Sequence, residues 1–254
     1  MNRAVDPILV RTREVTRIYK SSGQPVHALR GVNLELPRGV LAVLKGRSGS
    51  GKTTLLNIIG GLDRPTQGNV DFDGLALEGL SEDQLNQLRR RRMGFIFQSF
   101  ALLPTYSAYE NVELVLRIAG LSRHEQAERA RRYLRAVGLA RWMDHRPDEM
   151  SGGQQQRVAI ARALATRPDL ILADEPTGEL DTTTSRQIFS LFRQIVEKEG
   201  LTILVTTHDP LVDEYADIIY TLSDGVIEVK SKIEETTNIP SPNTPAVTPT
   251  VRVR

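Results

Sequence analysis

One eight-residue segment, Gly-Arg-Ser-Gly-Ser-Gly-Lys-Thr at positions 46–53, constrains the fold of this chain more than any other segment. It follows a short continuous apolar run at residues 40–44, which is typical of a buried strand, and a helix is predicted over residues 52–60. Glycines in such a loop let successive backbone N–H groups point inward, and the helix adds its positive N-terminal end. The spacing therefore predicts a phosphate-binding loop in an α/β fold, rather than an ordinary glycine-rich turn.

The side chains of this phosphate loop have the chemistry that a nucleoside triphosphate requires. The ammonium group of Lys52 is expected to reach the β- and γ-phosphates, and the hydroxyl of Thr53 is expected to bind Mg²⁺. The loop alone does not decide which nucleotide is bound. The predicted nucleotide-binding residues here are Gly46, Arg47, Ser48, Gly49, Ser50, Gly51, Lys52, Thr53 and Thr54.

Two acids follow a second buried strand, which is predicted at residues 170–174. A carboxylate such as Asp174 at the end of a buried strand is costly unless it meets a cation or hydrogen-bond donors. With a phosphate loop in the same chain, we expect Asp174 to hold Mg²⁺ through water, although a turn aspartate is the alternative. Glu175 is the candidate general base that polarises the attacking water.

The pattern along the chain predicts an α/β core that is interrupted by helices. Alternating residues at 8–19 predict a strand, with a neighbour at 32–36, while the strands at 170–174 and 202–206 flank a helix over 182–199, as in a parallel crossover. Ser81, Ser107 and Ser122 each precede an acid or amide three residues later, a capping box that predicts a helix start. Residues 99–165 are predicted to be mostly helical, as a subdomain inserted into the core.

A pentapeptide between these two halves, Ser-Gly-Gly-Gln-Gln at positions 151–155, gives the chain a resemblance to ATP-binding cassette (ABC) ATPases over about residues 8–230. The resemblance implies a P-loop NTPase core with a mainly parallel sheet, an N-terminal antiparallel β subdomain and the inserted helical subdomain, all within residues 1–230. It also implies ATP and Mg²⁺ as ligands, and a homodimer that sandwiches two ATP molecules. In that arrangement Ser151, Gly152, Gly153 and Gln154 bind the γ-phosphate of ATP held by the other subunit.

Other residues match the same family in its chain order. Tyr19 lies where an aromatic side chain stacks on adenine, although a strand-end tyrosine is the alternative. Gln98, after an apolar run, matches the glutamine that contacts Mg²⁺ and the attacking water. Asp181 resembles the residue whose loop crosses the dimer interface, and His208 the histidine that senses the γ-phosphate. The signature has Met150 where leucine is usual, a substitution that conserves apolar volume.

Three stretches, at residues 60–66, 97–104 and 173–178, resemble the branch with lipoprotein-releasing, macrolide-exporting and cell-division cassettes. Glu179 and Val115 depart from that branch. The resemblance implies an ATPase that drives a membrane permease, with export or extracytoplasmic work on lipoprotein, peptide or drug. The alternative is a mechanotransmitting ATPase that regulates cell-envelope enzymes or senses antimicrobial peptides without transport. Soluble members of DNA repair or translation are disfavoured, because the chain lacks long coiled coils and a second cassette.

Composition limits where such a chain works and what it binds. The net charge is only +2, and the segment from Lys230 onward accounts for all of it, so nucleic acid is not an expected partner. No apolar run approaches the roughly 20 residues of a membrane span, no leader is apparent, and the absence of cysteine suits a reducing compartment. We expect a peripheral protein at the cytoplasmic face of the cell membrane.

Two further segments are read from composition. The four arginines at 89–92 are interpreted as a solvated helix C-terminus, with lipid headgroup contact as the lesser alternative. Residues 231–254 are rich in Pro and Thr and are predicted to be a disordered tail.

Overall fold

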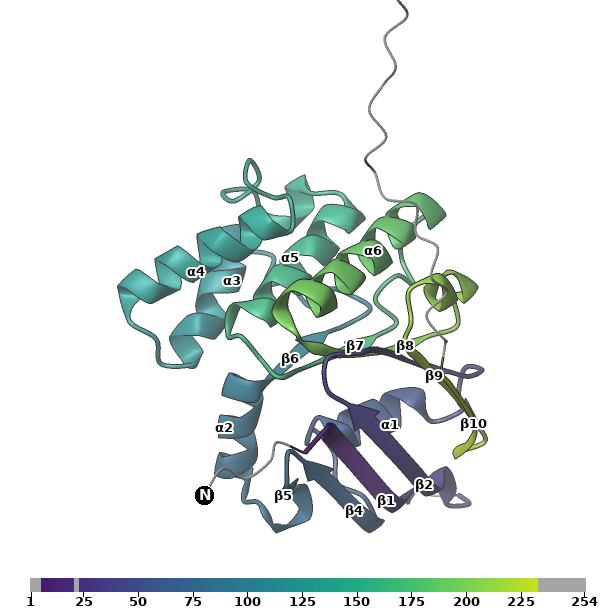
Figure 1. The fold of residues 1–254 in the computed structure, drawn as a ribbon. Coiled ribbons are helices and arrows are strands. Elements are labelled where there is room, and N and C mark those ends of the chain that lie inside the picture. The colour runs from purple at the N-terminus through teal and green to yellow at the C-terminus, as the bar shows by residue number, and fades with distance from the viewer. Residues whose placement is uncertain (1–5, 21–22, 233–254) are drawn as a thin grey trace, which may run out of the picture.

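The computed structural model describes residues 6–20 and 23–232, and Figure 1 shows two β-sheets with helices packed around them. The larger sheet has six strands in the order β10-β9-β3-β8-β7-β6. All its neighbouring strands run parallel except β10, which pairs antiparallel with β9, so the predicted mainly parallel sheet is confirmed. Its strands are β3 (Leu41–Lys45), β6 (Met93–Ile96), β7 (Leu170–Asp174), β8 (Thr202–Thr207), β9 (Ile218–Ser223) and β10 (Val226–Lys232).

The second sheet is antiparallel, as expected for the N-terminal part, and has the order β2-β1-β4-β5. Its first strand matches the predicted alternation, whereas β4 and β5 were not expected from the sequence, because Gly, Asn and Asp interrupt any apolar alternation there. Its strands are β1 (Ile8–Tyr19), β2 (Val26–Pro37), β4 (Gln67–Phe72) and β5 (Leu75–Ala76).

In the part of the chain that the structure describes, six α-helices connect and cover these sheets: α1 (Lys52–Ile59), α2 (Glu82–Arg92), α3 (Ala108–Ile118), α4 (Arg123–Ala136), α5 (Gly152–Ala165) and α6 (Thr182–Glu199). Short 3-10 helices lie at Leu77–Gly79, Pro147–Glu149 and Pro210–Glu214. The capping boxes of Ser81, Ser107 and Ser122 are all formed. Ser151 forms a fourth box with Gln154, and α5 begins at Gly152.

The six-stranded sheet is the middle layer of the molecule, and alternate residues of β3 show this. Leu41 and Val43 belong to a buried cluster formed with α3, α4, α5 and α6. Ala42 and Leu44 belong to a second cluster, formed with α1 and the antiparallel sheet. Because successive strand residues face opposite sides, burial on both faces explains the continuous apolar run at this strand. Figure 1 shows α5 and α6 on one side of the sheet and α1 on the other.

The regular elements that the structure describes between residues 99 and 165 are all helical. Their division from the core as a separate subdomain stays a prediction. The last strand, β10, extends to Lys232, and the rest of the predicted tail lies outside the described residues. Among the described residues, no helix is both long and apolar enough to cross a membrane.

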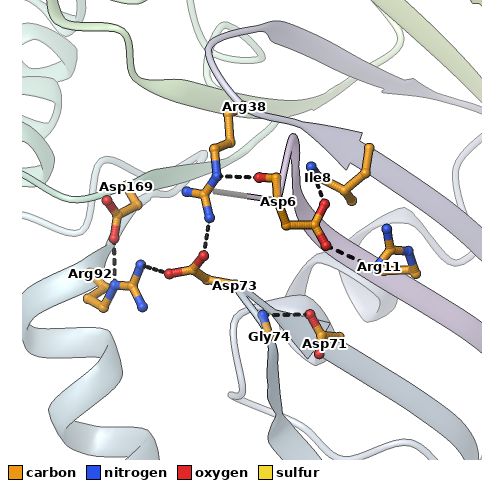
Figure 2. A network of polar contacts seen from close by, with 9 residues as sticks. All are labelled: Asp6, Ile8, Arg11, Arg38, Asp71, Asp73, Gly74, Arg92 and Asp169. Carbon is orange, nitrogen blue, oxygen red and sulfur yellow. Dashed lines mark hydrogen bonds and ion pairs between the residues drawn. The ribbon is translucent and has the colours of Figure 1, made fainter. Parts of the chain in front are cut away.

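The edge at which β3, β6 and β7 begin is held by a network of charged side chains (Figure 2). Arg38, just before β3, contacts Asp73 in the turn between β4 and β5, and its Nε donates to the backbone oxygen of Asp6 at 2.9 Å. Arg92, the last residue of α2, places Nη2 2.5 Å from Asp73 and Nε 2.5 Å from Asp169, just before β7. This basal network therefore joins the antiparallel sheet to α2 and to the central sheet, at the edge away from the phosphate loop.

The four arginines at the end of α2 differ in how exposed they are. Arg90 and Arg91 are exposed, as a solvated helix C-terminus would have them, but Arg89 and Arg92 are only partly exposed. Arg89 donates to the backbone oxygen of Gly61, and Arg92 belongs to the basal network. The interpretation of the whole run as a solvated end was therefore wrong for two of its four members, because carboxylate and carbonyl partners from distant segments reach them.

Candidate functional site

The phosphate loop joins the C-terminal end of β3 to α1, as the sequence predicts. Gly51, directly before the helix, has φ of 105°, and a Cβ at this position would lie 2.4 Å from the backbone oxygen of Ala28. Only glycine fits there. The Lys52 ammonium folds back over the loop and donates to the backbone oxygens of Gly46 at 2.9 Å and Arg47 at 3.2 Å. These carbonyls hold the cation at the mouth of the loop.

The loop also holds a polar group that lacks a partner. The side-chain oxygen of Ser50 is buried and makes no hydrogen bond within the described residues. Arg47, Ser48 and Gly49, which precede it, are exposed. A buried hydroxyl without a partner is costly, so its presence beneath an exposed loop fits an anion that supplies the missing acceptor. The loop residues that are present therefore suit a phosphate group.

The two acids after β7 meet the loop from the neighbouring strand ends. Asp174 Oδ1 accepts hydrogen bonds from Thr53 Oγ1 at 3.1 Å and from Thr206 Oγ1, in β8, at 2.5 Å. Glu175 has φ of 44°, an uncommon conformation for a residue other than glycine, and its N–H donates to the backbone oxygen of Thr206 at 3.0 Å. The left-handed turn separates the two carboxylates, so that they serve different partners.

The Glu175 carboxylate faces two groups that the sequence places far away. Its Oε2 lies 3.0 Å from His208 Nδ1, and its Oε1 lies 3.6 Å from Lys52 Nζ. Lys52 and Glu175 are both largely buried, while the His208 side chain is exposed. The structure thus brings the predicted base, histidine and phosphate-loop lysine together at the carboxyl ends of parallel strands, where ligands of α/β sheets bind.

The oxygen donors here suit a hard cation that is completed by a ligand. Within residues 6–20 and 23–232, no group of three or more His, Cys, Asp or Glu side chains could hold a metal ion. Mg²⁺ is typically bound by one or two carboxylates together with substrate phosphates. The adjacent oxygens of Thr53 and Asp174 at the phosphate loop match that mode of binding.

Gln98 follows β6 and lies beside the turn that follows Glu175. Its side-chain nitrogen is 3.2 Å from the position that a Cβ on Gly178 would occupy, and the backbone oxygen of Glu175 is 3.4 Å from the same point. The Gln98 side chain is exposed. The structure therefore places this predicted glutamine at the rim of the acid turn.

The predicted signature residues form the capped N-terminus of α5. Ser151 Oγ accepts from the Gln154 N–H at 3.4 Å, and Ser151 N–H donates to Gln154 Oε1 at 2.9 Å. Cβ positions at Gly152 and Gly153 would lie 3.2 Å from Leu180 and 2.6 Å from Thr184. In the described part of the chain, no hydrogen bond joins this helix end to the phosphate loop. The N-terminus of α5 instead packs against Leu180, in the loop before α6, and against Thr184 in the first turn of α6.

Asp181, expected at a dimer contact, caps α6 in this chain. Its carboxylate accepts from the Thr184 hydroxyl at 2.6 Å and from the Thr184 N–H at 3.0 Å. These hydrogen bonds hold the pKa of Asp181 below its ordinary value, so it stays ionised. The residue is exposed, and its dimer role stays a prediction.

Tyr19 is held by residues outside the phosphate loop. Its hydroxyl donates to Asp63 Oδ2 at 2.7 Å, and the Arg17 guanidinium carbon lies 4.5 Å from the ring centroid. The ring is 37% exposed. Adenine stacking on the open part of this ring stays a prediction.

Thr206 is a site residue that sequence reasoning missed. Its hydroxyl donates to Asp174 at 2.5 Å and accepts from the Glu175 N–H at 3.1 Å, so it fixes both acids. The available signal was a polar residue near the end of an apolar strand, two positions before His208.

Comparisons with known proteins show which family the chain resembles. The ABC transporter family model matches residues 29–178. The chain is 44% identical to the lipoprotein-releasing system ATP-binding protein LolD 2 of Caulobacter vibrioides, covering 89% of this chain and 98% of that protein. It is 47% identical to the macrolide export ATP-binding/permease protein MacB of Syntrophobacter fumaroxidans over 88% of this chain, but it spans only 32% of that protein.

Among solved structures, the ATP-binding cassette MJ0796 is 43% identical to this chain, with a TM-score of 0.82 over 89% of this chain and 99% of that one. The structure is a dimer in a post-hydrolysis state, bound to ADP and Pi. Its sequence comes from Methanocaldococcus jannaschii. A second structure, cbiO1 of Clostridium perfringens, is 28% identical, with a TM-score of 0.81.

Proposed function

This chain belongs to the ABC transporter family, and from that premise we propose that it is the ATP-hydrolysing subunit of an exporter-type membrane complex. As a cassette of this family it binds and hydrolyses ATP. The convergence of Lys52, Glu175 and His208 at the phosphate loop is the observation that supports this function most strongly. A cation for the phosphates, a candidate base and a histidine that orients it lie in one place, as a hydrolytic site requires.

In the proposed mechanism Glu175 accepts a proton from the attacking water, and His208 holds the carboxylate through its Nδ1. Lys52 moves from the loop carbonyls and Glu175 to the β- and γ-phosphates, which frees the base for water. Mg²⁺, when bound, neutralises phosphate charge, and Thr53, Asp174 and Gln98 are the residues proposed to hold it. General-base catalysis of this kind contributes roughly 10²–10⁴-fold to the rate.

The site is proposed to be complete only in a dimer. The N-terminus of α5, with exposed Ser151 and half-buried Gly152 and Gly153, offers N–H groups and a positive helix end to an anion. These residues do not bond to the phosphate loop of their own chain, so a second copy is needed to bring them to ATP. A symmetric pair would place each signature over the other chain's phosphate loop and bind two ATP molecules.

A groove of about 500 Å³ near the end of α2 is the proposed docking site for the membrane partner. Its exposed apolar side chains include Leu62, Leu103 and Ile118, which are 41–50% exposed. Three arginines and no acid line it: Arg89, Arg90 and Arg162. A cytoplasmic helix of the permease with an apolar face and an acidic residue matches this groove in shape and charge. Such docking would place the cassette at the cytoplasmic face of the membrane.

The relatives favour export or extracytoplasmic work as the task, because MacB is named for macrolide export and LolD for lipoprotein release. A mechanotransmitting complex without a transported substrate is the second candidate, since the partner and not the cassette would choose the substrate. A photo-crosslinking residue in place of Leu103 tests the proposal in native membranes, with the same residue at exposed Val26 as the control. Crosslinks from position 103 to an acidic cytoplasmic helix of a permease support the proposal, and equal crosslinking from both positions contradicts it.

A further inference from the structure

An arginine of α5 holds the loop that follows Gln98. Arg162 Nη2 donates to the backbone oxygen of Phe100 at 2.9 Å, and Nη1 donates to the backbone oxygen of Ala101. Within the described residues, Arg162 makes no ion pair with a carboxylate. Burial without a counter-charge lowers the pKa of the guanidinium, so these two carbonyls are what satisfy it.

The loop that Arg162 holds has an uncommon backbone. Phe100 and Ala101 both have positive φ, at 60° and 49°. Non-glycine residues adopt this conformation rarely, and it persists only where surrounding contacts impose it. The internal contacts are Phe100 N–H to Phe97 O at 3.1 Å and Ala101 N–H to Ser99 O at 2.6 Å. The fork of Arg162 therefore holds the carbonyls of both residues of this turn from outside.

The same turn reaches three parts of the molecule. At its start Gln98 lies beside the acid turn at Gly178. In its middle the Phe100 ring is buried, with Cζ 3.7 Å from the Cβ position of Gly152 at the signature helix. At its end Ala101 lines the proposed docking groove together with Arg162. A shift of this turn would thus move Gln98 beside the acid turn, Phe100 beside the signature helix and Ala101 in the groove.

We propose that Arg162 is a positioning residue that fixes the left-handed turn after Gln98 and links the docking groove to the catalytic site. The proposal rests on the proposed ATPase function. Arg162 acts through the two carbonyls, and its bidentate fork is the part that lysine cannot reproduce. An acidic group docked in the groove would meet the same guanidinium and would compete with those carbonyls for its N–H groups.

The first test removes the fork and then removes the strain that the fork maintains. Arg162→Gln is expected to lower kcat for ATP about tenfold with KM within about twofold, because Gln98 and not the phosphate loop is displaced. Adding Ala101→Gly, which adopts positive φ without strain, is expected to restore most of that loss. The kcat of Arg162→Lys should lie between those of the parent and Arg162→Gln. This variant keeps the test valid if the glutamine variant does not fold.

The matched control is Arg157→Gln. Arg157 lies on the same helix and donates to the Val137 oxygen and to Gln187, neither of which belongs to the turn, so kcat should be unchanged. Equal losses at both arginines, or failure of Ala101→Gly to restore the rate, would overturn the proposal. A parent protein without ATP hydrolysis would instead contradict the proposed function itself.

The second test uses the absence of cysteine from the chain. Leu103→Cys puts one thiol in the groove, and an acidic maleimide attached there imitates an occupied groove. The label is expected to change kcat at least about threefold in the parent and to have little effect in the Arg162→Gln Ala101→Gly background. The same label at Val26→Cys is the control. An equal response in both backgrounds would show that the groove acts without Arg162.

Discussion

The two edges of the central sheet differ in the partners that their charged and polar side chains have. At the basal edge each guanidinium of Arg38 and Arg92 meets a carboxylate, and Asp73 is shared between them. At the nucleotide edge the Lys52 ammonium rests on carbonyls and lies 3.6 Å from Glu175, and the Ser50 hydroxyl is buried without a partner. The charged groups at the basal edge therefore have partners of opposite charge, whereas at the nucleotide edge one buried hydroxyl, that of Ser50, has no partner among the described residues and is available to a ligand.

The contrast extends to the backbone. Among the described residues with positive φ other than glycine, Glu175 lies at the nucleotide edge and Phe100 and Ala101 lie in the turn after Gln98, whereas Asp73 and Arg167 lie in short connections at the basal edge. Strain that surrounding contacts must maintain is common at functional sites. At the nucleotide edge these uncommon conformations belong to residues of the proposed site and of the turn after Gln98, whereas those at the basal edge lie outside the site.

The largest expected effect comes from removing the base at the nucleotide edge. Glu175→Gln should lower single-turnover hydrolysis about 10²–10⁴-fold while ATP binding persists, because glutamine keeps the shape but accepts no proton. The control is Glu199→Gln at the exposed end of α6, which should hydrolyse ATP at the parent rate. Hydrolysis by Glu175→Gln at the parent rate would rule out the assigned base and weaken the contrast between the edges.

At the basal edge, Asp73→Asn should cost stability and leave catalysis intact. The substitution removes the negative charge that Arg38 and Arg92 share. We expect this loss to lower the free energy of unfolding by about 1–3 kcal/mol. The matched control is Asp71→Asn, because Asp71 lies in β4 beside this turn and, among the described residues, its side chain accepts only from the Gly74 N–H (Figure 2). Denaturant unfolding measures the change, and a lowered kcat per folded molecule would contradict the separation of the two edges.

The basal network also gives a pH dependence. Burial alone raises the pKa of Asp73, but the hydrogen bond from Arg92 and the charges of Arg38 and Arg92 outweigh it, so the pKa lies below its ordinary value of 3.8. The stabilisation is therefore complete above that value and is lost as pH falls through the lowered pKa in the folded state. Unfolding measured from pH 6 downward should show a steeper loss below about pH 4 in the parent than in Asp73→Asn. If the stabilities of the parent and Asp73→Asn fell in parallel with pH, the network would not favour the ionised form of Asp73.

The smallest expected effect distinguishes two equivalent capping boxes. Ser122→Ala at α4 and Ser151→Ala at α5 should each lower the free energy of unfolding by about 1 kcal/mol. Only Ser151→Ala should also weaken ATP-dependent dimerisation, measured by light scattering in the Glu175→Gln background. Equal dimerisation by both variants would show that the Ser151 cap stabilises the helix but has no role in dimerisation.

The sequence was sufficient wherever a short segment decides its own structure. The phosphate loop, the strand at residues 170–174, the helix over 182–199 and the three expected serine caps depend on neighbours within a few positions. The proximity of Lys52, Thr53, Asp174 and Glu175 also followed, because parallel strands end at one edge. The family was recognisable before any contact was known, because the phosphate loop and the pentapeptide at residues 151–155 are short motifs.

The tertiary structure alone decided which distant groups complete one another. Thr206 joins both acids across 31 and 32 residues of chain, and Arg162 holds a turn about 60 residues earlier. Arg92 has its partners 19 and 77 residues away, so its neighbours in the arginine run gave no sign of them. Local sequence encodes propensity and spacing, whereas the pairing of a buried charge or hydroxyl depends on which segments the packed layers bring into contact.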